Sequence, residues 1–204
     1  MDRILDAAAQ LFAEKGFDAV SMNAVAAAAD VSKANVFHHF TSKQTLYLAV
    51  LKTACSQSTA ALDEMGATSG PFAERLRFFI RQHLANLRRN EGMSRLILRE
   101  VLDSDRDKSK TLADRVINQN FSKLVEFLRE GQFSGALRAD VDPAMVATLI
   151  VGANVFFFQS SGVLRHLAEV DFADQPERYT DVVADILLRG IVNSPTSLQT
   201  DTRK

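Results

Sequence analysis

VSKANVFHHFTSK, residues 31–43, is the stretch from which the fold of this chain can be predicted. An alanine-rich segment of helical character, residues 22–29, lies just before it, and Ser42 is placed to cap a further helix just after it. Two short helices joined by about three or four residues form a helix-turn-helix, whose second helix is shaped to lie in the major groove of DNA. The stretch therefore predicts a DNA-reading element.

The side chains of this predicted recognition helix suit contact with DNA. Small residues at its start let the backbone approach closely, and Asn35 can present a donor and an acceptor together to an adenine edge. Basic side chains at both ends can reach phosphate oxygens. Ser21 is a predicted helix cap, and the same helix start can also accept a phosphate. The predicted DNA-contacting residues are Ser21, Ser32, Lys33, Ala34, Asn35, Phe37, His38 and Lys43.

The order of residues from Arg3 to Leu51 resembles the DNA-binding domain of the tetracycline-repressor (TetR) family. The resemblance implies an all-α fold, with an N-terminal three-helix helix-turn-helix domain and a C-terminal helical domain that binds a ligand and dimerises. Two residues depart from the family pattern. Asp30 stands where the family usually has Gly, and Phe37 stands where it most often has a Tyr whose hydroxyl binds phosphate. Phe37 is therefore expected to lack one usual contact, and its ring is left to pack.

The domain limits follow from composition and from this resemblance. We expect a helix-turn-helix domain over residues 1–51, a ligand-binding and dimerisation domain over residues 52–193, and a disordered polar tail over residues 194–204. The helix that starts at Ser42 is expected to continue to about Leu62 and to connect the two domains. The clearest break is MGATSGP, residues 65–71, which is predicted to be a loop.

Composition bounds the class of protein. The 204 residues carry a net charge of −1, so DNA binding must depend on where the charges lie and not on their total. The single cysteine, Cys55, excludes an internal disulfide and fits a reducing cytoplasm, with either a redox-sensing thiol or a buried one left open. The chain start has no signal-peptide pattern, and the apolar segment 145–158 is judged too short to span a bilayer. The prediction is a cytoplasmic protein without membrane contact.

The predicted helix over residues 143–167 is apolar on two faces, so it needs two covers. One cover is its own domain. The other is either a second subunit or the same bundle of a monomer. The resemblance favours a homodimer that forms through the last two long helices, paired as a four-helix bundle. The predicted interface residues are Met145, Leu149, Gly152, Phe156, Val163, Val183, Ile186 and Leu187.

The second half of the chain is where the resemblance implies an inducer site. Fourteen Phe and no Trp suit an apolar pocket, although phenylalanines at helical spacing also form plain core. An amide on an apolar helix needs a partner, which either the ligand or a second subunit can supply. The predicted pocket residues are Phe78, Met93, Ile97, Ile117, Phe121, Asn154, Phe157 and Phe158. The expected ligand is a lipophilic small molecule with few polar groups.

Three classes of function remain to be weighed. An enzyme is disfavoured, because no Ser/His/Asp order, phosphate loop or Cys/His metal cluster is evident, and no cofactor or metal is predicted. A non-specific architectural protein needs a basic surplus that the chain lacks. The remaining class is a dimeric transcriptional regulator that binds a palindromic operator in double-stranded DNA. It is expected to be a repressor released by its inducer, with an activator as the alternative.

Overall fold

The computed structural model describes residues 1–103 and 110–192, and in those ranges every regular element is a helix. The all-α fold class is thereby confirmed; the predicted tail, residues 194–204, lies outside the described residues. At one end of the molecule lie α1 (Asp2–Ala19), α2 (Met22–Ala28), α3 (Lys33–His39) and α4 (Lys43–Ala54), which we call the head. The body contains α5 (Ser56–Ala67), α6 (Phe72–Arg89), α7 (Glu91–Asp103), the π-helical turn η1 (Ala113–Ile117), α9 (Asn118–Phe133), α10 (Pro143–Leu164) and α11 (Pro176–Ile191).

Serine caps start three of the four head helices. Ser21 Oγ accepts a hydrogen bond from the backbone N–H of Ala24 (3.1 Å), which confirms the predicted cap of α2. Ser42 starts α4 with a reciprocal pair, in which its Oγ accepts from Thr45 N–H (3.1 Å) and Thr45 Oγ1 accepts from Ser42 N–H (3.0 Å). The serine caps fix where α2, α3 and α4 begin.

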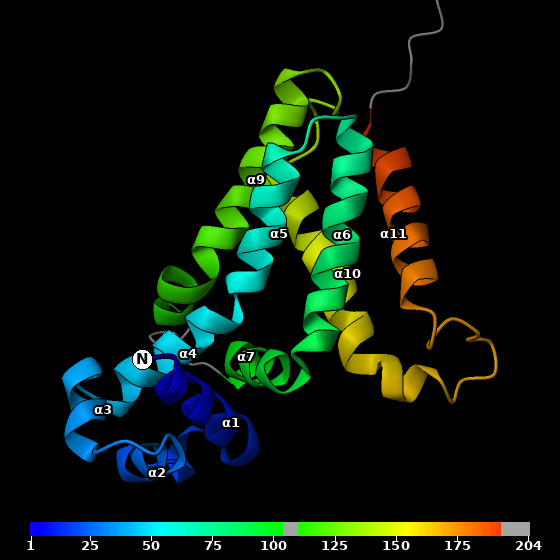
Figure 1. Cartoon of the computed structure of the whole chain (residues 1–204). Helices are drawn as coiled ribbons and strands as arrows, with labels where there is room; N and C mark the ends of the chain where they lie inside the picture. Colours follow the sequence, from blue (N-terminus) through cyan, green and yellow to red (C-terminus); the bar gives the residue numbers. More distant parts are fainter. Residues whose placement is uncertain (104–109, 193–204) are drawn as a thin grey trace, which may run out of the picture.

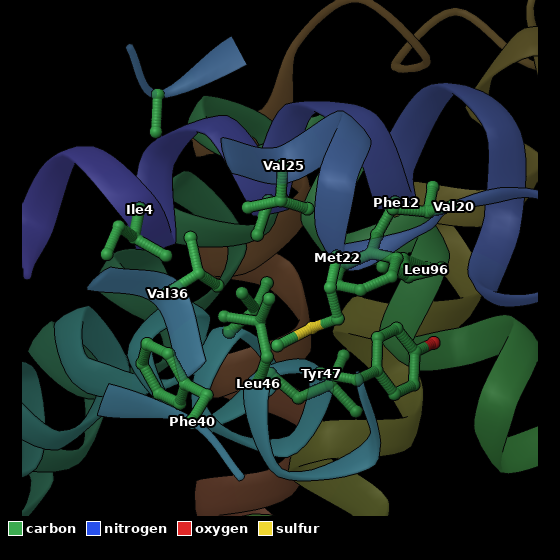
Figure 2. Packing of buried hydrophobic residues seen from close by; sticks show 14 of the residues in the cluster. Ile4, Phe12, Val20, Met22, Val25, Val36, Phe40, Leu46, Tyr47 and Leu96 are labelled. Carbon is green, nitrogen blue, oxygen red and sulfur yellow. The ribbon is translucent and has the colours of Figure 1, made fainter. Parts of the chain in front are cut away.

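The core of the head extends beyond the head itself (Figure 2). Phe12 of α1, Val36 of α3 and Leu46 of α4 are fully buried in one cluster. Leu96 of α7 is only 2% exposed and belongs to the same cluster, as does Val116 of η1. Residues of the body therefore complete the core of the head.

The connection from head to body differs from the expected single helix over residues 42–62. The helix is interrupted at Cys55, where α4 ends and α5 begins. The carbonyl oxygen of Cys55 accepts hydrogen bonds from Thr59 Oγ1 (3.2 Å) and from Asn120 Nδ2 of α9 (3.1 Å). Side-chain donors that compete for a helix carbonyl are a known cause of such bends.

The body packs around α6, which contacts α5, α10 and α11. Its buried residues include Leu76 and Ile80 of α6, Leu128 of α9 and Ile150 of α10. With 22 residues, α10 is long and apolar enough to cross a membrane by length and composition, which corrects the expectation that this segment is too short. A core helix passes the same test, and α10 packs against α6 and α9.

Candidate DNA interface, apolar cavity and exposed helix face

One face of α3 is exposed and does not pack against the rest of the described chain. Ser32, the N-cap, accepts from the backbone N–H of Asn35 (3.2 Å), so the start of α3 is fixed at the predicted residue. Val36 and Phe40 point into the head core. The exposed residues of this segment are Ser32, Lys33, Ala34, Asn35, Phe37, His38 and His39. In the described part of the chain the Asn35 amide has no hydrogen-bond partner, so both its donor and its acceptor are available.

Phe37 contributes to the exposed face and does not pack in the core. Its side chain is 41% exposed, and Lys33 Nζ lies 5.7 Å from its ring centre, within the range of a cation–π contact. This contact holds an ammonium group beside the aromatic ring on the outer face of α3. His38 and His39 lie next to each other with ring centres 5.2 Å apart.

Lys43 has a partner inside the head. Its Nζ donates to the carbonyl oxygen of Phe17 (2.9 Å) and lies 4.3 Å from the centre of the Phe17 ring. A second, longer bond goes to the carbonyl of Asp18 (3.3 Å). Because an ammonium carries three hydrogens, these two bonds leave one for a phosphate. The geometry thus gives Lys43 a structural role beside the DNA contact predicted for it.

Asp30 occupies the turn between α2 and α3 with a φ of +52°. Within the described chain it is the one non-glycine residue with a positive φ. Arg3 Nη2 of α1 donates a hydrogen bond to Asp30 Oδ2 (3.2 Å), so the negative charge in the turn is paired. The pair is exposed, and its contribution to stability is small.

A largely apolar cavity of about 370 Å³ lies in the body, next to the head. Its walls come from the end of α4 and from α5, α6, α7, η1, α9 and α10, with Phe79, Leu98 and Leu124 among the apolar lining residues. The polar lining groups include Ser58, His83, Asn86, Ser94 and Asn120. Among the described residues no charged side chain lines this space.

The predicted pocket residues divide into two groups. Ile97, Ile117 and Phe121 line the cavity. The other five predicted residues do not line the cavity. Each contacts other parts of the chain. Phe78 packs against the body core, Met93 packs against the head core, Phe157 stacks on Tyr179, Phe158 lies under the guanidinium of Arg95, and Asn154 lies behind the cavity wall.

Sequence reasoning missed the polar pair His83 and Asn86 on α6. They are three residues apart, so they share one face of the helix, and both line the cavity. Both are less than one tenth exposed. Polar residues three apart within an otherwise apolar stripe are the signal that could have identified them.

His83 is held by Asn154 of α10. Asn154 is fully buried, and its Nδ2 donates to the carbonyl oxygen of Ile80 (2.8 Å) and lies 3.1 Å from His83 Nδ1. Burial lowers the pKa of His83 to about 4, since the charged form cannot be hydrated there. The imidazole is therefore neutral at physiological pH. Burial likewise raises the pKa of the Cys55 thiol to about 11, which makes it unreactive and disfavours the redox reading.

Helix α7 lies between cavity and head and touches both. Ile97, Leu98 and Val101 face the cavity, whereas Leu96 is buried in the head core. The π-helical turn η1 has the same arrangement, with Ile117 on the cavity and Val116 in the head core. Helix α7 and the turn η1 therefore each contribute side chains both to the cavity lining and to the head core.

A second exposed feature is a set of large apolar side chains on α10 and α11, which we call the exposed apolar face; on α11, Val182 and Ile186 lie beside charged side chains that include Arg77 and Asp181. Phe156 and Val163 are each 66% exposed, and Ile186 is 68% exposed. The other predicted interface residues of α10, Met145, Leu149 and Gly152, are exposed as well, whereas Val183 and Leu187 of α11 are half-buried. Val182, 51% exposed, takes their place on the outer face and was not predicted. The described residues of the chain leave these side chains uncovered.

Known proteins resemble this chain along most of its length. A family model described as "Bacterial regulatory proteins, tetR family" matches residues 4–50, and one described as "Tetracyclin repressor-like, C-terminal domain" matches residues 73–187. The HTH-type transcriptional regulator UidR of Escherichia coli K12 is 24% identical over 155 residues, which cover 73% of this chain and 74% of UidR. The two family models leave out residues 51–72, which include the helix break at Cys55.

Two further similarities bear on the head and on the whole fold. The negative transcriptional regulator IcaR of the biofilm operon icaADBC in Staphylococcus aureus is 39% identical over 46 residues, covering 22% of this chain and 25% of IcaR. The structure of the flavonoid-responsive regulator FrrA is 25% identical with a TM-score of 0.64, and the alignment covers 95% of this chain and 97% of FrrA. The IcaR match is as long as a helix-turn-helix domain, and the FrrA match extends over head and body alike.

Proposed function

This chain belongs to the TetR family of bacterial transcriptional regulators, and from that premise we propose that it is a homodimeric repressor released from DNA by a lipophilic small molecule. The observation that carries the proposal is the double contact of α7 and η1, which line the cavity on one side and complete the head core on the other. A ligand in the cavity acts on the head through these side chains.

Repression is supported by the similarity to IcaR, a negative transcriptional regulator, over a stretch as long as a helix-turn-helix domain. In the proposed complex Asn35 reads a base edge in the major groove, while Ser21, Ser32 and Lys33 contact phosphates. The two heads of a dimer meet the two halves of a palindromic operator, about one helical turn or somewhat more apart. Such a complex acts where bacterial DNA lies, in the cytoplasm.

Dimerisation is supported by the exposed apolar face of α10 and α11. Large side chains that remain more than half exposed along one face are unusual in a monomer. Gly152 adds to this argument, since a Cβ at this position would meet nothing within 4 Å in the chain. A mid-helix glycine costs about 1 kcal/mol relative to alanine. Gly152 also lines the cavity, and close packing of a second subunit against α10 would make a second use of the same small residue.

A lipophilic effector is supported by the nature of the cavity walls, which are mainly apolar and carry a few neutral polar groups. FrrA, which is named as flavonoid-responsive, provides an example of a similar fold that responds to an aromatic molecule. Release requires that the effector bind more tightly to the head arrangement that does not fit the operator. The cavity is then the place where that difference in affinity arises.

The test begins with selection of bound fragments from random DNA by the purified protein. A mobility shift with the selected fragment should persist in excess random DNA, and apolar compounds that stabilise the protein should abolish it. A shift that random DNA removes would favour an architectural protein. A shift that such a compound strengthens would point to an activator or a corepressor mechanism.

A further inference from the structure

The orientation of the His83 imidazole can be derived from its neighbours. Asn154 lies against the carbonyl oxygen of Ile80 at 2.8 Å, and because a carbonyl only accepts hydrogen bonds, the amide atom facing it must be nitrogen. The same nitrogen lies 3.1 Å from His83 Nδ1 and has a second hydrogen to give. Nδ1 must therefore be the acceptor, and in a neutral ring the proton resides on Nε2.

The Nε2–H group of His83 remains free to bind a ligand. Among the described residues it has no hydrogen-bond partner, and it is not one of the fully enclosed polar atoms that lack one. The side chain lines the cavity and is 8% exposed. The ring also stacks on Phe79 with ring centres 5.7 Å apart, which holds its plane in place. An oriented and unsatisfied donor thus faces the apolar space.

A second donor lies one turn further along α6. Arg89 Nη1 donates to Asn86 Oδ1 (3.4 Å), and because a guanidinium only donates, this contact assigns the amide oxygen and leaves the amide nitrogen of Asn86 to the cavity side. Asn86 is 7% exposed and lines the same space. The two buried residues therefore both have hydrogens to offer. What they can bind is an acceptor.

The charge of that acceptor follows from the surroundings. His83 is neutral because its burial lowers the pKa to about 4, and among the described residues no Lys or Arg lines the cavity. A carboxylate or phosphate that enters such a space loses its hydration without gaining a counter-charge, which is costly. A carbonyl oxygen loses far less on entry and gains the hydrogen bond.

We infer that the effector is an uncharged, mainly apolar molecule whose ketone, ester or amide oxygen accepts a hydrogen bond from His83 Nε2–H, with Asn86 as a second donor. This inference rests on the proposed function, since it assigns the ligand of the same cavity. A cavity of about 370 Å³ corresponds to roughly a dozen water volumes of about 30 Å³, which suits a small molecule of two rings or a short chain. Free carboxylic acids of the same skeleton are excluded by charge.

Three probes of matched shape separate these possibilities. Benzophenone carries the carbonyl, diphenylmethane lacks it, and diphenylacetate carries a carboxylate on a similar skeleton. Calorimetric titration of the whole protein should show benzophenone binding about five- to tenfold more tightly than diphenylmethane, as expected for one neutral hydrogen bond. Diphenylacetate should bind most weakly. Equal affinities of the first two, tightest binding of the carboxylate, or no binding of any probe would overturn the inference.

Two variants test whether His83 is the residue that makes benzophenone bind more tightly than diphenylmethane. In His83→Phe the advantage of benzophenone over diphenylmethane should shrink to about twofold or less, while Thr148→Val serves as the matched control. Thr148 also lines the cavity, but its hydroxyl already donates to the carbonyl of Ala144 (2.8 Å), so the advantage should be retained. Should His83→Phe fail to fold, ¹⁵N NMR of histidine in the wild type decides. The Nε2–H signal should shift with benzophenone and not with diphenylmethane, and a proton found on Nδ1 would contradict the assignment.

Failure of this inference can be told from failure of the proposed function by adding each probe to the protein–operator complex. If diphenylacetate released the operator, the proposed repressor function would stand, and the inference of an uncharged ligand would be refuted. A His83-dependent preference for benzophenone without release of the operator would support the ligand class and refute its role as an inducer of this kind.

Discussion

At the scale of single residues, Asp30 determines how the two helices of the reading element are joined. Its φ of +52° is a conformation that strains any residue with a Cβ. Asp tolerates the strain better than most side chains, and Arg3 binds its carboxylate. Asp30 therefore forms this turn with less strain than most residues would, but with more strain than Gly would.

Replacement of Asp30 by Gly and by Ala should separate backbone strain from charge. Both variants lose the exposed ion pair with Arg3, but only Ala keeps the strain of a Cβ at positive φ. The Gly variant should be more stable than the Ala variant by about 1 kcal/mol. Urea unfolding of the two proteins measures this difference. Equal stabilities would show that the turn relaxes to a negative φ when the side chain changes.

Asn35→Ala tests the assignment of base reading to one side chain. The amide is exposed and makes no hydrogen bond among the described residues, so its loss should leave the thermal midpoint unchanged. If Asn35 pairs with an adenine, operator affinity should fall by about 1–3 kcal/mol and preference at one base pair should relax. Fluorescence anisotropy with the operator and with single-base variants provides the comparison. A uniform loss across all sequences would assign Asn35 to phosphate contact.

His83 makes the stability of the protein depend on pH. Its folded-state pKa of about 4 lies below the ordinary value of 6.5, so between these values the unfolded chain binds more protons. Stability should therefore fall as the pH drops from about 6.5 to about 4, by about 3 kcal/mol in total. Other groups titrate in this range too, so the relevant quantity is the difference between the wild type and His83→Phe at each pH. A difference independent of pH would contradict the burial of a neutral imidazole.

At the scale of elements, α7 is the helix through which the proposed ligand would act on the head. Neighbouring leucines face opposite ways, with Leu96 in the head core and Leu98 on the cavity. Leu96→Ala should therefore cost about 2–5 kcal/mol of stability and weaken operator binding. Leu98→Ala should alter the affinity for cavity ligands and leave operator binding close to that of the wild type. Thermal unfolding and anisotropy titrations test both. Equal loss of operator affinity in the two variants would refute the division of α7 into two faces.

The sequence was most informative where local rules decide the structure. The caps at Ser21, Ser32 and Ser42 each require only one side chain and the next turn of helix, and the structure has all three. The two stripes of α10 follow from helical periodicity alone, and the exposed one is where the sequence placed it. The break at Cys55 could not be predicted, because it depends on Asn120, which lies 65 residues away in the chain.

The cavity was the hardest feature to predict, and the reason is physical. A phenylalanine in the core and one in a pocket have the same spacing along a helix, so the sequence could not separate Phe121, which lines the cavity, from Phe157, which stacks on Tyr179. The polar residues carried more information than the aromatic ones. Asn154 was identified as an amide that needs a partner, but the partner, His83, emerged only from the packing of α6 against α10.

At the scale of the whole molecule, the weak charge of the chain determines how recognition must work. A protein with a net charge of −1 gains little from general attraction to DNA. A recognition helix of seven residues with few cations should bind one half-site poorly. The proposed dimer would compensate for this weakness, because it would present two such helices to one operator.

The mass of the protein–operator complex in solution tests this account most directly. Sedimentation should give two chains of 22.5 kDa per operator for the wild type. It should give the same for Phe133→Asp, a control at a 91% exposed position on α9. Phe156→Asp places a carboxylate in the proposed interface, so the free protein should sediment as a single chain, stay folded and lose most of its operator affinity. A Phe156→Asp protein that still binds as two chains, with the affinity of the wild type, would contradict the dimer on which recognition depends.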